Sequence, residues 1–386
     1  MRGTSSFTQL ARLAALAFVA ACAADSTGPD ASQSPSLSRG HDDAESGAVY
    51  TMTNSATSNA VVAFHRAEDG SLTPLGSVST GGRGVGGTID PLVSQYSIVL
   101  SRDDDRLLFA VNAGSNDVSS FRIKEGGAPR LTDRVSSGGL RPVSLALHDN
   151  LLYVLNAGDN TLTGFRTAES GKLVALPHAS ASLAPGTSTP TAIRFTNDGR
   201  YLIVSERGTQ ALEVFPVEPN GRLGAGRVSA SHGAGTFGFD VTPTNKIIVS
   251  EAAGAAPNGA VSSYDLVGSA LHTITGSLDT GSRATCWLIA TTDGRFAFTA
   301  NAGSATITGF LIAPNGALSA NGSASTGAGS TPLDLDVAGR NRFIYVLQGG
   351  DGNIGAFAVT STGGLTSLGQ VSAGAGGSGL QGLASF

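Results

Sequence analysis

The sequence predicts an all-β fold, a seven-bladed β-propeller whose ring is closed by the last strand, on the strength of three observations. Gly accounts for 53 of the 386 residues, whereas charged residues make up only 14% of the chain. Average proteins contain roughly 7% Gly and 25% charged residues, so this composition favours many short strands joined by tight turns. Apolar β-type runs recur along the chain without helical periodicity. The third observation is a sevenfold repeat, and a repeat of this kind without helices is typical of propellers.

Composition also excludes several classes of protein. With 40% apolar residues, the chain can bury a core, unlike disordered proteins, which combine low hydrophobicity with high charge. No Gly-X-Y period runs through it, which excludes collagen. A formal net charge of −5 offers no broad basic surface, so we expect no nucleic-acid partner.

Residues 1–21 are predicted to be a signal peptide. Arg2 and Arg12 precede the apolar run 13–21, which is too short for a bilayer, where roughly 20 residues are needed, but suits a signal-peptide core. Its end, Val-Ala-Ala followed by Cys22, resembles the lipobox of bacterial lipoproteins. That resemblance implies lipidation of Cys22, with ordinary cleavage after Ala23 as the alternative.

The expected product is therefore an exported protein. We expect a lipoprotein anchored in the cell envelope, in the periplasm, on the outer membrane or at the cell surface, or a secreted protein if it is not lipidated. Residues 22–47 are rich in Ser, Asp and Pro and are predicted to be a flexible tether. Cys286 is then the remaining Cys of the mature chain, so no intrachain disulfide is expected.

Residues 48–386 are predicted to form the propeller. Each repeat carries a polar marker residue after a buried apolar run: Asn54, Asn112, Asn156, Glu206, Glu251, Asn301 and Gln348. The intervals between successive markers are 58, 44, 50, 45, 50 and 47 residues. Seven markers at this period predict seven blades.

The order of strands A to D within a blade is clearest in the fourth repeat. Strand A is predicted over 190–195, strand B over 201–205 and strand C over 212–217, with a weaker outer strand D beyond them. An Asp-Gly turn signal separates A from B. The first repeat has no preceding strand A, but 379–386 resembles one. The last strand is therefore predicted to pair with the first blade and to remove the exposed edge.

The strand ends and turns resemble those of lactonase-type seven-bladed propellers. Strand ends of the form Tyr-Val-x-Asn, preceded by Asp-Gly-Arg turns, are shared with the bacterial propeller 6-phosphogluconolactonases and the fungal carboxymuconate cyclases. The segments 90–95, 249–252 and 285–287 resemble a secreted subset of that family. The resemblance covers about 48–386 and implies a lactonase, or a related cycloisomerase, that takes a lactone or a carbohydrate as its ligand.

The B–C and D–A connections of antiparallel blades fall on one face, which we expect to converge on the central channel as a binding funnel. Two markers on this face are carboxylates, Glu206 and Glu251, and Arg207 follows the first. Lactone hydrolysis needs a base and a group that stabilises an oxyanion. Glu206 or Glu251 is therefore a candidate base, with Arg207 and Arg141 as charge stabilisers. The alternative is structural, with these charges paired to neighbouring blades.

Candidate substrate-binding residues lie at strand A starts and at the last marker: Gln95, Tyr96, Trp287 and Gln348. Trp287 either stacks on a ligand ring or wedges between blades. The family's enzymes are linked to a channel His, Arg and Glu, and Glu206 matches the position of the Glu. His148 is expected in an A–B turn on the opposite face, so the resemblance assigns no catalytic His to it.

No cofactor or metal is predicted. Gly-x-Gly-x-x-Gly occurs at 82–87, but in an expected interblade loop rather than between a strand and a helix. The acidic run 102–106 lacks the spacing of a calcium loop. The chain also lacks the Gly-x-Ser-x-Gly pattern. The alternative function is a non-catalytic surface module that binds a glycan, a peptide or an envelope component, and a closed ring is expected to be a monomer.

Overall fold

The computed structural model describes residues 45–101, 106–186 and 188–386. In these ranges every regular element is a β-strand, and the strands form seven antiparallel sheets of four. The predicted signal peptide, Cys22 and nearly all of the predicted tether lie outside the described residues. Across the ranges given above, no helix is long and apolar enough to cross a membrane.

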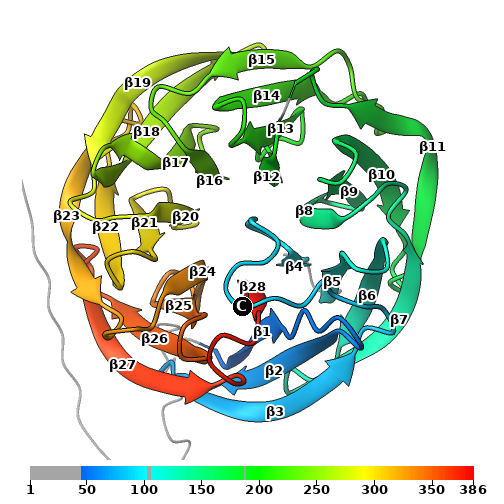
Figure 1. Ribbon diagram of the computed structural model, residues 1–386, viewed down its shortest axis with the longest axis horizontal. Helices are drawn as coiled ribbons and strands as arrows, with labels where there is room; N and C mark the ends of the chain where they lie inside the picture. The colour runs from blue at the N-terminus through cyan, green and yellow to red at the C-terminus, as the bar shows by residue number, and fades with distance from the viewer. Residues whose placement is uncertain (1–44, 102–105, 187) are drawn as a thin grey trace, which may run out of the picture. The chain divides into compact units, whose positions relative to one another are not determined.

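The seven sheets follow one another around a ring as the blades of a propeller (Figure 1). The innermost A strands of blades one to seven are β28 (Gln381–Ser385), β4 (Ile98–Leu100), β8 (Pro142–His148), β12 (Pro190–Phe195), β16 (Thr236–Val241), β20 (Thr285–Ala290) and β24 (Pro332–Ala338). The B strands are β1 (Gly47–Met52), β5 (Leu107–Asn112), β9 (Leu151–Asn156), β13 (Tyr201–Glu206), β17 (Ile247–Ala255), β21 (Phe296–Asn301) and β25 (Phe343–Gln348).

The two outer strands of each blade complete the sheets. The C strands are β2 (Ala60–Arg66), β6 (Asp117–Ile123), β10 (Thr161–Thr167), β14 (Ala211–Pro216), β18 (Asn258–Val267), β22 (Thr306–Ile312) and β26 (Asn353–Val359). The D strands are β3 (Leu72–Ser79), β7 (Pro129–Ser136), β11 (Leu173–Ser182), β15 (Arg227–Ala230), β19 (Ala270–Asp279), β23 (Leu318–Ser325) and β27 (Leu365–Ser372).

Burial explains which sequence runs form which strands. The B strands β5, β9, β21 and β25 are buried along their whole length, because both faces of a blade pack against neighbours. Continuous apolar runs are the signature of strands covered on both faces. The D strands β3 and β27 are mostly exposed and polar. The core therefore lies between the blades, over their A, B and C strands.

The C-terminal strand closes the ring, as predicted. β28 pairs antiparallel with β1, with Tyr50 opposite Ala384 and Met52 opposite Gln381. The Thr51 hydroxyl donates a hydrogen bond to the Gly382 carbonyl at 2.7 Å. Blade one is thus built from both ends of the propeller.

The connection from β3 to β4 departs from the repeat. Its last part, Asp90–Ser97, which we call the channel segment, lies inside the ring (Figure 1). Leu92 and all four residues from Ser94 to Ser97 are buried. Because the chain turns inward here, β4 has only three residues, whereas the A strands of the other blades have five to seven.

Hydrogen bonds tie the channel segment to five other blades, and the one from blade one is donated by the Gln381 side chain to the Asp90 carboxylate at 3.1 Å. In blade three, the Val143 carbonyl accepts a hydrogen bond from the Ser94 hydroxyl at 2.9 Å. In blade four, the Thr191 carbonyl accepts one from the backbone amide of Gln95 at 3.0 Å. In blade six, the Trp287 indole donates to the Ser94 carbonyl at 2.9 Å. Blade five is reached through Tyr96, described below. These hydrogen bonds therefore hold the channel segment in one position inside the ring.

Candidate functional site

Two cavities open at the end of the channel that carries the A–B turns. The first has a volume of about 370 Å³ and the second about 350 Å³, and Val99, Leu100, Ser101 and Arg194 line both. The first is also bounded by the turn after β8, and the second by the turn after β20. The sequence had favoured a site on the face of the B–C connections, and these cavities lie on the opposite face.

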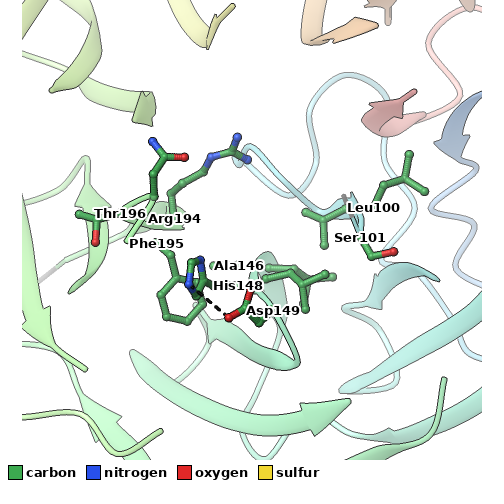
Figure 2. A pocket seen from close by; sticks show the side chains of 12 residues that line it. Leu100, Ser101, Ala146, His148, Asp149, Arg194, Phe195 and Thr196 are labelled. Atoms are coloured by element: carbon green, nitrogen blue, oxygen red, sulfur yellow. Dashed lines mark ion pairs between the residues drawn. The ribbon is translucent and has the colours of Figure 1, made fainter. Parts of the chain in front are cut away.

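Arg194 is the charged group common to both cavities. It lies next to the end of β12, with its guanidinium directed away from His148 (Figure 2). Its Nε forms an ion pair with Asp240 Oδ1 at 2.8 Å, and its Cζ lies 4.5 Å from the centre of the Tyr96 ring. Burial alone would lower the pKa of Arg194, but Asp240, Tyr96 and Asp336 outweigh it and raise that pKa. Arg194 is therefore a permanent cation in the wall of the cavities.

The carboxylates near Arg194 are engaged by backbone amides. Asp240 accepts hydrogen bonds from the Val241 amide at 2.8 Å and the Ala290 amide at 2.9 Å. Asp336 accepts one from the Ser385 amide at 2.7 Å. These bonds tie each A strand to the A strand of the next blade. The two side chains consequently serve as interblade links, and neither is a free base.

His148 supplies the imidazole ring in the lining of the first cavity. Its side chain is 30% exposed, lines the first cavity, and has Nε2 3.7 Å from Asp149 Oδ2 (Figure 2). Its ring packs at 5.7 Å from that of Phe195. Ser101 and Thr292 add hydroxyl groups to the lining. The cavities thus combine an imidazole, a fixed cation and hydroxyls, a set suited to hydrolysis at a carbonyl.

Of the sequence-predicted bases, Glu206 is buried inside blade four. Its side chain accepts a hydrogen bond from the Thr209 hydroxyl at 2.6 Å. Burial, reinforced by the charge of Glu213, raises the pKa of Glu206 to about 7. Its other oxygen, Oε1, is buried with no hydrogen-bond partner among the described residues. Glu206 therefore lies between strands of its own blade.

Glu251, the second predicted base, is fully occupied. Its carboxylate accepts hydrogen bonds from the hydroxyls of Ser231, Ser262 and Ser277 and from the Gly233 amide, at 2.7–3.2 Å. Since Ser231 and Gly233 belong to the preceding D–A connection, Glu251 fixes that connection to blade five. These contacts favour the structural alternative for this residue.

The two predicted arginines lie on the B–C face, near the start of the channel segment. Arg207 lies over the Phe237 ring at 5.9 Å, and Arg141 donates a hydrogen bond to the Pro91 carbonyl at 3.0 Å. Burial raises the pKa of Asp90 to about 7, although hydrogen bonds from Gln381 and Ser94 and the charge of Arg207 lower it. The described contacts do not bring these arginines together with Glu206 and Glu251.

All four predicted substrate-binding residues are buried and donate side-chain hydrogen bonds to the backbone. Gln95 donates to the Leu288 carbonyl at 2.6 Å, Trp287 to Ser94, and Gln348 to the Thr326 carbonyl at 3.1 Å. Tyr96 is also buried, but it lines the second cavity beneath Arg194. Tyr96 thus connects the predicted set to the cavities.

Arg194 and Asp240 were missed by sequence reasoning, although both carry a signal. Each is the charged residue in an otherwise uncharged A strand of a charge-poor chain. His148 was given no catalytic role in the sequence analysis, because it lies on the A–B face and the site was predicted on the opposite face. Within the described ranges, no group of three or more His, Cys, Asp or Glu residues could hold a metal ion.

Comparison with known proteins agrees with this architecture. The family model described as lactonase, 7-bladed beta-propeller, matches residues 45–183 and 149–254. No match was found among curated proteins.

Solved structures are similar over nearly their whole length. A protein from Bacteroides fragilis provisionally assigned as a 6-phosphogluconolactonase has a TM-score of 0.72 and 19% identity, covering 90% of this chain and 99% of that one. The periplasmic gluconolactonase of Pseudomonas aeruginosa has a TM-score of 0.67 and 19% identity, covering 87% and 99%. At these identities the likeness establishes the fold.

Proposed function

The chain belongs to the family of seven-bladed lactonase β-propellers, and on that premise we propose that it hydrolyses a small lactone, such as a sugar lactone, in the cavities at the A–B end. The observation that carries the proposal is the placement of Arg194 in the wall shared by both cavities. His148 lines the first of them. A cation and a base beside one cavity are what this reaction requires.

The proposed reaction uses these two groups in sequence. His148 takes a proton from a water molecule as the water oxygen attacks the lactone carbonyl. Arg194 stabilises the negative charge on the former carbonyl oxygen. The ring C–O bond then breaks, and the leaving alkoxide takes the proton back from His148. The product is an open hydroxy acid, and no oxidant or reductant takes part.

The decisive experiment measures opening of glucono-δ-lactone by the full chain with a pH indicator, against buffer alone. We expect His148→Gln to reduce kcat by roughly 10²-fold or more, because general-base catalysis contributes 10²–10⁴-fold. His272→Gln is the matched control, since His272 is exposed on β19. Full activity of His148→Gln would exclude His148 as the base.

The same assay separates the remaining alternatives. Loss of activity in a Glu206→Gln, Glu251→Gln double variant that stays folded, with His148→Gln active, would move the reaction to the B–C face with Arg207 and Arg141. Saturable binding of a glycan or peptide without turnover of any lactone would favour the non-catalytic binding module.

We also propose that the chain is exported and anchored through Cys22. The apolar run before Cys22 and the small residues next to it support this proposal. Metabolic labelling with palmitate should mark the unmodified chain in the membrane fraction. A Cys22→Ser variant should take up no label, and equal labelling of both would exclude the anchor.

A further inference from the structure

We propose that Tyr96 and Asp240 hold Arg194 as a fixed carboxylate-binding fork, so that the A–B cavities bind small hydroxy acids as ligands in their own right. The inference rests on the proposed function only in taking the same cavities as the site. It assigns the ligand class, an organic carboxylate, and two positioning residues, neither of which is a catalytic residue.

Asp240 is the first of the two residues that hold the Arg194 guanidinium, and it fixes the group in its plane. Asp240 contacts Nε at 2.8 Å, and its own two oxygens are fixed by the amides of Val241 and Ala290. The carboxylate that holds Arg194 is thus itself held by two blades. With Nε anchored, the guanidinium keeps one edge toward Asp240 and presents its other edge elsewhere.

The second support fixes the guanidinium from below. The Tyr96 ring lies under Cζ at 4.5 Å. Its hydroxyl donates to the Phe239 carbonyl at 2.8 Å, and its carbonyl accepts from the Leu145 amide at 2.9 Å. Tyr96 is therefore pinned at its backbone and at the tip of its ring, and the ring cannot swing away from Arg194.

Tyr96 reaches this place because the channel segment has an unusual backbone. Its φ is +63°, and Asp90 and Val93 have φ of +44° and +55°. A non-Gly residue in this region is uncommon, and for a β-branched residue such as Val93 it is a genuine outlier. Such conformations persist where the surroundings impose them and cluster at functional sites. Here the surroundings are the blades to which the segment is hydrogen-bonded.

The free edge of Arg194 matches a carboxylate. Nη1 and Nη2 donate no hydrogen bond to any described residue, and the side chain is 22% exposed where it lines both cavities. A planar guanidinium edge offers two parallel donors, which fit the two oxygens of a carboxylate. Because Asp240 and Tyr96 already fix the Arg194 guanidinium, it loses little conformational freedom when a ligand binds.

The test measures binding of gluconate, the probe, to the full chain by calorimetry and by NMR of ¹⁵N-labelled arginine. We expect saturable binding and a shift of the Arg194 Nη signals. Arg194→Lys should weaken binding at least tenfold, because Lys lacks the fork. Arg227→Lys, on the exposed strand β15, should bind as the unmodified chain does. Absence of gluconate binding to the unmodified chain would overturn the proposal.

The positioning roles have their own readouts. Tyr96→Phe keeps the ring and should keep the affinity within about twofold, whereas Tyr96→Leu should weaken it about tenfold. If Tyr96→Leu does not fold, the unmodified chain still decides: stacking on Tyr96 should shift the Arg194 Hδ signals upfield through the ring current. Unshifted Hδ signals, or full affinity in a folded Tyr96→Leu variant, would remove the positioning role.

Failure of this proposal is distinguishable from failure of the proposed function. Gluconate binding without any lactone turnover would leave the carboxylate site standing and reject hydrolysis. Lactone turnover that depends on His148, without gluconate binding, would reject the carboxylate site and leave hydrolysis standing.

Discussion

Glu206 is a carboxyl group whose surroundings favour its neutral form. Its side chain is 1% exposed, and it shares blade four with Glu213, which is also buried. Two buried carboxyl groups this near cannot both ionise without a large electrostatic penalty. A proton held at Glu206 removes that penalty and also provides a donor for a hydrogen bond with Glu213.

This arrangement predicts that stability falls as pH rises. The pKa of Glu206 is about 7 in the folded chain, against an ordinary 4.5. Between these values the folded chain keeps the proton and the unfolded chain releases it, so the free energy of unfolding decreases through this window and levels off above it. We expect Glu206→Gln, which mimics the protonated acid, to remove up to about 3 kcal/mol of this loss.

Thermal unfolding at pH 5 and pH 8 measures the effect. The variant should be more stable than the unmodified chain at pH 8, and the difference should shrink toward pH 5. Glu125→Gln is the control, because Glu125 is exposed. A pH dependence unchanged by Glu206→Gln would show that Glu206 is ionised in the folded chain at neutral pH.

The two Glu markers were recognisable in the sequence, but their partners were not. Glu206 and Glu251 stand out because they replace Asn in the repeat. What they contact depends on residues from other strands and connections, such as Glu213 and Ser277. Ser, Thr and Glu are too common around the blades for sequence spacing to identify those pairs.

At the scale of elements, the channel segment is the departure that matters most. The sequence predicted the sheets correctly because apolar runs and polar markers repeat in every blade. It did not predict that 90–97 would enter the channel. One signal was present: the interval from Asn54 to Asn112 is 58 residues, whereas the others are 44 to 50. The extra residues lie in the connection between β3 and β4, which contains the segment.

Trp287 joins the channel segment to blade six, and replacing it with a smaller side chain tests how much this contact stabilises the protein. The indole is 2% exposed, donates to the Ser94 carbonyl, and packs edge-on against Phe237 with ring centres 5.1 Å apart. Trp287→Phe should lower the free energy of unfolding by about 2–4 kcal/mol, since the buried Ser94 carbonyl loses its shorter hydrogen bond, keeping that from Gln381 at 3.4 Å, and a void opens beside it. Denaturant unfolding followed by circular dichroism measures the change.

Leu311→Ala is a suitable comparison, because Leu311 is 39% exposed on β22. It should change stability by less than about 0.5 kcal/mol. If Trp287→Phe proves equally neutral, the indole does not fix the channel segment to blade six. The carboxylate fork proposed for Arg194 would then have to rely on the bond from Gln95 to the Leu288 carbonyl and on the other blades that the segment contacts.

At the scale of the whole molecule, carboxylates of two A strands bond to backbone amides in the A strand of the next blade, between blades five and six and between blades seven and one. Asp240 binds the Ala290 amide, Asp334 the Leu383 amide at 3.3 Å, and Asp336 the Ser385 amide. These carboxylates lie in A strands that line the channel. The residues that close the ring and those that shape the candidate site are therefore neighbours, and in the case of Asp240 the same residue does both.

Removal of residues 381–386 should for this reason affect the whole propeller. The truncation leaves β1 as an unpaired edge and removes the Leu383 and Ser385 amides that donate to Asp334 and Asp336 across the blade interface. It also removes the buried Leu383 and Ala384. Loss of a single buried Leu already costs about 2–5 kcal/mol. We expect the Tm to fall by roughly 10 °C or more, since each kcal/mol is worth about 2–4 °C in chains of 150–250 residues.

The manner of unfolding separates ring closure from a local effect. If β28 closes the ring, tyrosine absorbance, which averages over several blades, and Trp287 fluorescence in blade six should report the same lowered midpoint. Val228→Ser, in the exposed outer strand β15, should leave both probes unchanged. A truncated chain whose Trp287 transition stays at the original Tm would mean that blade six is stable without closure, and that the ring unfolds blade by blade.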